Sequence, residues 1–190
     1  MHTPLHEHAR LGIDIGRVII GAVGEDGTAD TSFLGGSEAD ALATQAETGA
    51  FDTIRALVDR LDGRVWLVSK CGARVQALTR RWLLHHEFHT LTELPVENLR
   101  FCKERPQKRD IAATLELTHF IDDRLDVLRH LDGLVPSLYW FGRQSARPPD
   151  WVVPARDWRK VRRLLLPELR DEQVFGGDVI DEPDRRAGDV

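Results

Sequence analysis

Short apolar runs alternate with longer amphipathic stretches along most of the chain. The runs are rich in Val, Ile, Leu and aromatic residues, and they cover residues 11–20, 64–68, 99–102, 118–121 and 134–141. In the stretches between them, apolar residues recur at helical spacing, for example over residues 51–61. Strands that alternate with helices are typical of βαβ units. The pattern therefore predicts an α/β fold with a mostly parallel sheet.

The first apolar run, residues 11–20, contains a single carboxylate, Asp14. A nearly continuous apolar run predicts a central strand that is covered on both faces. Burying a carboxylate inside such a strand costs free energy. Asp14 is therefore either a costly accident or the working group of a functional site. Gly12 and Gly16 flank Asp14 and leave room for the backbone to approach a ligand. Asp14 is therefore the first candidate functional residue.

The other elements follow from the same patterns. A hairpin is expected directly after Asp14, with residues 18–23 and 31–34 as its strands around the turn signal of residues 24–28. Helices are expected within residues 37–61, 73–89, 108–117, 127–131 and 157–166, and a last short strand at 151–153. We expect residues 1–9 to form a flexible lead-in, residues 10–167 a single domain, and residues 168–190 an acidic, mobile tail.

Composition narrows the class of protein. The chain has 190 residues, a formal charge of −5 and 42% apolar residues, which gives no general attraction to nucleic acid or anionic membranes. Two cysteines, Cys71 and Cys102, do not make a disulfide framework, which favours a reducing compartment. No apolar run approaches the length of a membrane span, and the first residues lack the apolar core of a signal peptide. We expect a cytoplasmic protein with no membrane partner.

Polar residues gather where the predicted strands end. Asp14 lies in the first strand, Ser69 ends the second, Asp122 and Asp123 end the fourth, and Lys108 begins the helix before the fourth. The carboxyl ends of parallel strands meet at one edge of the sheet, where ligands bind. Carboxylates so close together need a counter-ion, and Mg²⁺ prefers oxygen ligands. A hydroxyl and a lysine beside that cation would hold a phosphate.

This arrangement resembles the haloacid dehalogenase-like (HAD) superfamily, whose four motifs occur in the same order over residues 11–131. Residues 13–16 (Ile-Asp-Ile-Gly) resemble the nucleophile motif, and residues 65–69 the second motif, which ends in a phosphate-holding serine. Lys108 stands in the place of the family's lysine, although Lys103 is an alternative, and residues 120–123 (Phe-Ile-Asp-Asp) resemble the acidic metal motif. The resemblance implies a three-layer Rossmann-like core with a β-hairpin flap after the first strand.

The resemblance also implies a mechanism. Asp14 would attack phosphorus to form an aspartyl-phosphate, and Lys108 would neutralise charge on Asp14 and on the phosphoryl group. Ser69 and Lys70 would bind the phosphate.

The implied cofactor is Mg²⁺. Its ligands would be Asp14, the carbonyl of Gly16, and one or both of Asp122 and Asp123. The substrate would be a phosphorylated small molecule or a nucleotide, with a nucleic-acid end as a less favoured alternative. The segments between the motifs leave no obvious room for a cap domain, so the site would be open.

One position departs from the family. Phosphatases of the superfamily have a second aspartate two residues after the nucleophile, which protonates the leaving oxygen, and this chain has Gly16 there. Loss of a general acid/base costs about 10²–10⁴-fold in rate. Three hypotheses remain open: a Mg²⁺-dependent phosphohydrolase, with Glu25 or Asp26 of the flap as a substitute acid; a binding protein that has lost turnover; and a dehalogenase-like hydrolase.

Other patterns have simpler explanations. Ser69, Asp122 and Asp123 are also suitable helix caps. His85 and His89 are four residues apart and would make a zinc pair on one helix, but no third ligand is evident. Basic clusters such as residues 105–109 and 159–163 are most simply explained as solvated helix faces.

Overall fold

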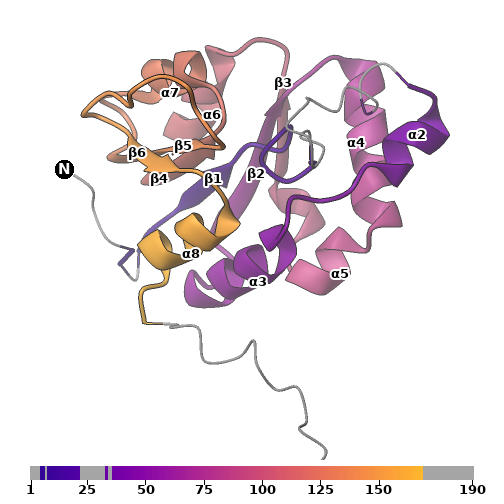
Figure 1. The fold of residues 1–190 in the computed structure, drawn as a ribbon, viewed down its shortest axis with the longest axis horizontal. Helices are drawn as coiled ribbons and strands as arrows, with labels where there is room; N and C mark the ends of the chain where they lie inside the picture. The colour runs from indigo at the N-terminus through magenta and orange to yellow at the C-terminus, as the bar shows by residue number, and fades with distance from the viewer. Residues whose placement is uncertain (1–4, 7, 22–32, 34–35, 169–190) are drawn as a thin grey trace, which may run out of the picture.

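A six-stranded, fully parallel sheet forms the centre of the computed structural model, which describes residues 5–6, 8–21, 33 and 36–168. The strands are β1 (Leu11–Ile13), β2 (Val65–Lys70), β3 (Leu99–Cys102), β4 (His119–Asp122), β5 (Ser137–Phe141) and β6 (Val153–Ala155). Their order across the sheet is β3-β2-β1-β4-β5-β6 (Figure 1). This order is the doubly wound, Rossmann-like one. The predicted α/β class and parallel sheet are confirmed.

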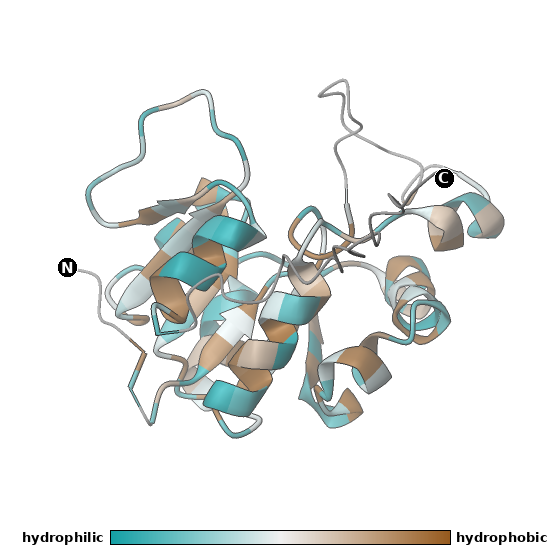
Figure 2. Ribbon diagram, turned by 60° about the horizontal axis from the view of Figure 1, so that its bottom comes forward, coloured by the Kyte–Doolittle hydropathy of each residue, from teal (hydrophilic) through white to brown (hydrophobic). Residues whose placement is uncertain are grey.

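Helices cover both faces of this sheet. In the described residues they are α2 (Glu38–Ala43), α3 (Ala50–Arg60), α4 (Ala73–His85), α5 (Phe88–Thr92), α6 (Gln107–Thr114), α7 (Leu125–Leu131) and α8 (Trp158–Leu165), with a 3₁₀ turn, η1 (Val96–Asn98). Helices α3, α4, α5 and α8 pack on one face around the larger hydrophobic cluster, and α6 and α7 pack on the other around the smaller one. The helices carry both hydrophobic and hydrophilic residues, as expected for elements with one buried face (Figure 2).

Alternation along the strands explains how one sheet feeds both clusters. In β2, Val65 and Leu67 belong to the larger cluster, whereas Trp66 and Val68 belong to the smaller one. Successive side chains of a strand point to opposite faces, so a strand buried on both sides is apolar throughout. The nearly continuous apolar runs of the sequence are therefore the signature of this three-layer arrangement.

The first strand is shorter than the sequence suggests. Strand β1 ends at Ile13, and the chain then turns tightly: the amides of Val18, Ile19 and Ile20 all donate to the carbonyl of Ile15. The prediction of an extended segment over residues 18–20 is wrong, because these apolar side chains are buried by a compact turn as completely as by a strand. The rest of the expected flap, residues 22–32 and 34–35, lies outside the described residues.

The predicted helix over residues 73–89 is also interrupted. Helix α4 ends at His85, Glu87 adopts a left-handed backbone conformation with φ = 51°, and α5 begins at Phe88. The break turns Phe88, which is fully buried, into the larger cluster. The predicted lead-in (residues 1–9) and tail (168–190) lie mostly outside the described residues, so the domain boundaries remain predictions.

Candidate metal and phosphate site

The candidate site lies at the point in the sheet where the order of the strands reverses, between β1 and β4. Strand β1 stands between β2 and β4, and the chain reaches β2 by way of α2 and α3 but reaches β4 by way of α6, on the opposite face. Connections that leave to opposite faces open a crevice at the carboxyl ends of the two neighbouring strands. Both β1 and β4 are followed there by aspartates.

Three carboxylates converge in this crevice. Asp14 follows β1 directly and its amide donates to the carbonyl of Ile121 (2.9 Å), which continues the pairing of β1 with β4. Asp122 is the last residue of β4, and Asp123 comes next. One oxygen from each of Asp14, Asp122 and Asp123 lies within 4.8 Å of the others. Within the described residues, Asp14, Asp122 and Asp123 are the acidic, histidine or cysteine side chains that lie close enough together to hold a metal ion.

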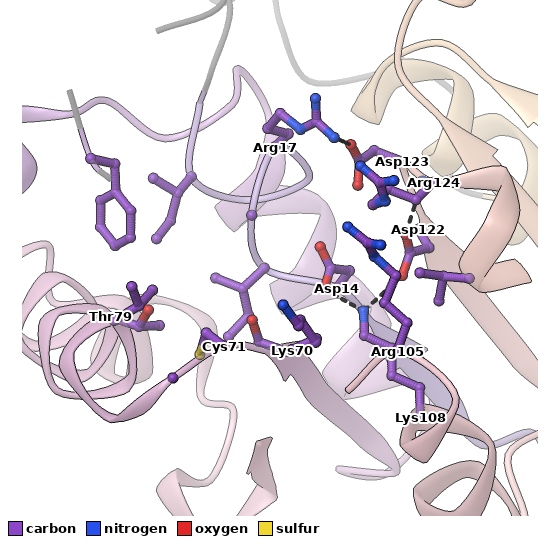
Figure 3. Close-up of a pocket in the computed structure, with 18 of the residues that line it drawn as sticks. Asp14, Arg17, Lys70, Cys71, Thr79, Arg105, Lys108, Asp122, Asp123 and Arg124 are labelled. Atoms are coloured by element: carbon purple, nitrogen blue, oxygen red, sulfur yellow. Dashed lines mark hydrogen bonds and ion pairs between the residues drawn. The ribbon is translucent and has the colours of Figure 1, made fainter. Parts of the chain in front are cut away.

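Lys108 bridges two of these carboxylates. It is the second residue of α6, and its Nζ donates to Asp14 Oδ1 (2.5 Å) and to Asp122 Oδ2 (2.7 Å), as Figure 3 shows. The lysine is 2% exposed and Asp122 is fully buried. Burial by itself lowers the pKa of a lysine, but the charges of Asp14 and Asp122 outweigh it and hold the pKa of Lys108 above its ordinary value. Lys108 is therefore a permanent cation inside the site.

Lys103, the alternative, does not join this group. It is exposed in the loop before α6, and its amide donates to the side chain of Gln107. Lys103 does not line the cavity that the three aspartates and Lys108 share. The geometry favours Lys108 for the role that the sequence left open.

The two neighbouring aspartates at the end of β4 have different environments. Burial raises the pKa of Asp122 above its ordinary value, and its Oδ1 accepts a hydrogen bond from the amide of Arg124 (2.9 Å). Burial, and then the nearby charge of Asp14, raise the pKa of Asp123 to about 6. Oxygens of both residues belong to the cluster, so both remain candidate metal ligands.

Arg17 is a member of the site that the sequence analysis did not single out. Its guanidinium forms an ion pair with Asp123 (2.5 Å). Its backbone has φ = 60°, a left-handed conformation that is costly for a residue with a side chain. The only sequence signal was its position beside Gly16, because nothing local indicates a partner that lies so far along the chain.

The remaining predicted residues line one cavity of about 550 Å³ together with this cluster. Ser69 is buried near the end of β2, and Lys70, the last residue of that strand, is exposed. Gly16 lines the same cavity, and among the described residues no atom beyond its two chain neighbours lies within 4 Å of the position that a Cβ at residue 16 would occupy. Helix α4 starts just beyond, after Gly72, so its first backbone amides have no side-chain cap.

The structure does not support the zinc pair considered for His85 and His89. The break after α4 removes the continuous helix that their spacing required. His89 Nδ1 instead lies 2.8 Å from the carbonyl oxygen of Leu94. His86, between them in sequence, is 2.8 Å from the carbonyl oxygen of Leu42 through Nε2. These histidines therefore serve local packing and hydrogen bonding.

Comparison with known proteins does not assign the chain to a family. No model of a protein family matches the chain, and no curated protein matches it significantly. No helix of the described residues is long and apolar enough to cross a membrane.

Proposed function

We propose that this chain is a HAD-like protein that binds Mg²⁺ and acts on a phosphate ester through Asp14. The observation that carries the proposal is the convergence of Asp14, Asp122 and Asp123 around the buried ammonium of Lys108. These residues lie up to 109 positions apart in sequence, and they meet at the crevice where doubly wound sheets bind ligands. The order of the motifs and the parallel sheet agree with the HAD-like interpretation.

The donor set fits magnesium. Hard divalent cations favour carboxylate oxygens, and the three aspartates offer such oxygens within a radius suited to one ion. The charges also fit: in the ion-paired cluster three carboxylates face two cations, Lys108 and Arg17. The other cations of the cavity lining, Lys70, Arg105 and Arg124, are available to a phosphate. Bound Mg²⁺ would supply the positive charge that lets a phosphate dianion approach an anionic nucleophile.

The protein groups have separate tasks in this proposal. An oxygen of Asp14 attacks phosphorus, the ester P–O bond breaks, and the leaving oxygen takes a proton from solvent. Water then attacks the phosphorus of the aspartyl-phosphate, the bond between Asp14 and phosphorus breaks, and phosphate leaves while the proton of the water returns to solvent and the carboxylate is restored. Lys108 holds Asp14 in position by a hydrogen bond and balances the charge that develops on the phosphoryl oxygens. Ser69, Lys70 and the uncapped amides at the start of α4 are the candidate ligands of those oxygens.

The missing proton donor defines a second candidate function. Apart from the three clustered aspartates, no carboxylate of the described residues lines the cavity, and Gly16 has no side chain to transfer a proton. Glu25 and Asp26, the flap candidates, lie outside the described residues. The same site without turnover would be a binding site for phosphate and Mg²⁺.

A first experiment tests the site itself. Hydrolysis of an activated aryl phosphate is measured with Mg²⁺ and with excess chelator, for wild type, Asp14→Asn and the control Asp62→Asn, an acid whose side chain is 92% exposed and does not line the cavity. The proposal expects Mg²⁺-dependent turnover that Asp14→Asn abolishes and Asp62→Asn preserves. Turnover that Asp14→Asn leaves intact contradicts it. Magnesium-dependent phosphate binding without turnover favours the second candidate.

A second experiment asks whether proton transfer is the defect. Gly16→Asp adds a carboxylate where the cavity has open space, and Gly16→Asn is a control of the same size that transfers no proton. If the missing acid limits the rate, Gly16→Asp accelerates hydrolysis of an ordinary alkyl phosphate by about 10²–10⁴-fold and Gly16→Asn does not. Equal effects of the two variants would count against the match of residue 16 to the family's second aspartate.

A further inference from the structure

The cavity is larger than a metal ion and a phosphate require. Its volume is about 550 Å³, within the range of pockets that hold whole organic ligands. Figure 3 shows Asp123 and Arg124 on one side of the cavity, and Cys71 and Thr79 on the other side, toward α4. The part of the cavity beside α4 is therefore available to the group that carries the phosphate.

The two sides differ in chemistry. The side toward β4 and α6 is lined by the aspartates and by the cations Lys108, Arg105 and Arg124, and Lys70 lies between the two sides, next to Cys71 (Figure 3). Helix α4 contributes Val75 and Thr79, which are four residues apart on one face, while its charged residues Arg74, Arg80 and Arg81 do not line the cavity. Phe33 and Ile20 complete the apolar side, and Val75 and Phe33 are only partly buried. Apolar surface thus stays open to a ligand.

From this asymmetry we propose that the site takes a phosphate ester whose carrier ends in a flat ring, joined to the phosphate directly, as in an aryl phosphate, or through a ribose, as in a nucleoside monophosphate. The inference rests on the proposed function, because the phosphate is assigned to the end that holds Asp14. A ring next to Val75 and Phe33 gains apolar contact. The side chains of Val75 and Phe33 offer no hydrogen-bond partner to the hydroxyls of a small polyol.

Phosphonates test the inference without turnover, because the carbon–phosphorus bond is not hydrolysed. Calorimetry with the full chain and Mg²⁺ compares methylphosphonate, phenylphosphonate and the phosphonate analogue of a nucleoside 5′-monophosphate. We expect the ring-bearing ligands to bind about tenfold tighter than methylphosphonate, a factor typical of added apolar contact in a pocket. A gain for phenylphosphonate alone assigns the site to aryl phosphates, and a gain for the nucleoside analogue assigns it to nucleotides. Both results support the proposal.

Two variants locate the contact. Val75→Ser lies in the first turn of α4, where serine is tolerated, and removes apolar surface from the cavity. Leu84→Ser is its control on the same helix, since Leu84 is 78% exposed and does not line the cavity. We expect Val75→Ser to remove most of the ring's advantage and to leave methylphosphonate binding unchanged, with no effect of Leu84→Ser. Circular dichroism of each variant verifies folding.

The outcomes distinguish a failure of the ring inference from a failure of the proposed function. If methylphosphonate binds with Mg²⁺ but a ring adds nothing, or if Val75→Ser behaves as wild type, the ring inference is wrong and the proposed function stands. If no phosphonate shows Mg²⁺-dependent binding, or if that binding survives unchanged in the double variant Asp122→Asn/Asp123→Asn, the proposed function fails and the inference fails with it.

Discussion

Replacing Lys108 by methionine tests the electrostatics of the site most directly. Methionine keeps an unbranched side chain of similar length, so the change removes the ammonium while largely preserving the packing. Lys108 is 2% exposed, and its Nζ lies 2.5 Å from Asp14 and 2.7 Å from Asp122. Without it, two buried carboxylates face each other with no cation between them. Removing one partner of a buried ion pair costs about 3–5 kcal/mol, because the remaining charge is left uncompensated.

The measurement is urea unfolding at pH 8, followed by the fluorescence of the five tryptophans. A loss of about 3–5 kcal/mol corresponds to a melting temperature roughly 6–20 °C lower for a chain of this size. Lys70→Met is the matched control: Lys70 is exposed and lines the same cavity, so we expect a change within about 0.5 kcal/mol. The double variant Lys108→Met/Asp122→Asn should recover part of the loss, because it also removes the buried charge.

The loss should also depend on pH in a defined direction. Burial already raises the pKa of Asp122, and loss of the ammonium, which opposes burial, raises it further. An acid whose pKa is higher in the folded protein than in the unfolded chain binds its proton on folding, so stability is lost as pH rises through the folded pKa. The deficit of Lys108→Met is therefore smaller at pH 5.5 than at pH 8. A deficit below about 1 kcal/mol at both pH values, or one equal to that of Lys70→Met, would refute the assignment of a buried ion pair.

Three further changes test other features. Gly12→Ala should lower the free energy of unfolding by about 1–3 kcal/mol in urea titrations, since its Cβ would lie 2.5 Å from the Phe120 ring; unchanged stability would contradict that packing. Arg17→Gly should leave the free energy of unfolding equal or raise it by up to about 1 kcal/mol, because relief of the left-handed backbone offsets an exposed ion pair to Asp123. Burial raises the pKa of the Cys71 thiol, so iodoacetamide should modify it at pH 7.5 far more slowly in the folded chain than in urea, as mass spectrometry would show; equal rates would contradict its burial.

The fold was largely accessible from the sequence because of how parallel sheets are built. Strands buried on both faces leave continuous apolar runs, and four of the expected strands lie within a few residues of those observed, as at residues 99–102. Asp122 and Asp123 were found for the same reason, since they end such a run. The prediction of an extended segment fails at residues 18–20, because a buried turn and a buried strand have the same composition.

The contacts that determine the chemistry of the site could not be predicted from the sequence in the same way. The sequence favoured Lys108 over Lys103 only by its place at a helix start, and the structure shows that Lys108 points inward whereas Lys103 is exposed. The pair of Arg17 and Asp123 joins residues from two strand ends, which depends on the strand order and on a left-handed backbone. The break at Glu87 is equally non-local, because the burial of Phe88 determines it rather than helix propensity.

The charge balance of the site links its two proposed ligands. The three carboxylates and their ion-paired partners Lys108 and Arg17 together carry one negative charge, which opposes the approach of a phosphate dianion to Asp14 itself. A bound divalent cation would give this cluster one positive charge, which would attract the dianion. In the proposed site, each ligand would therefore raise the affinity for the other by the same factor, as thermodynamic linkage requires. Lys108 would strengthen this coupling. It already holds Asp14 and Asp122 together by hydrogen bonds, which would reduce the reorganisation that binding of either ligand requires.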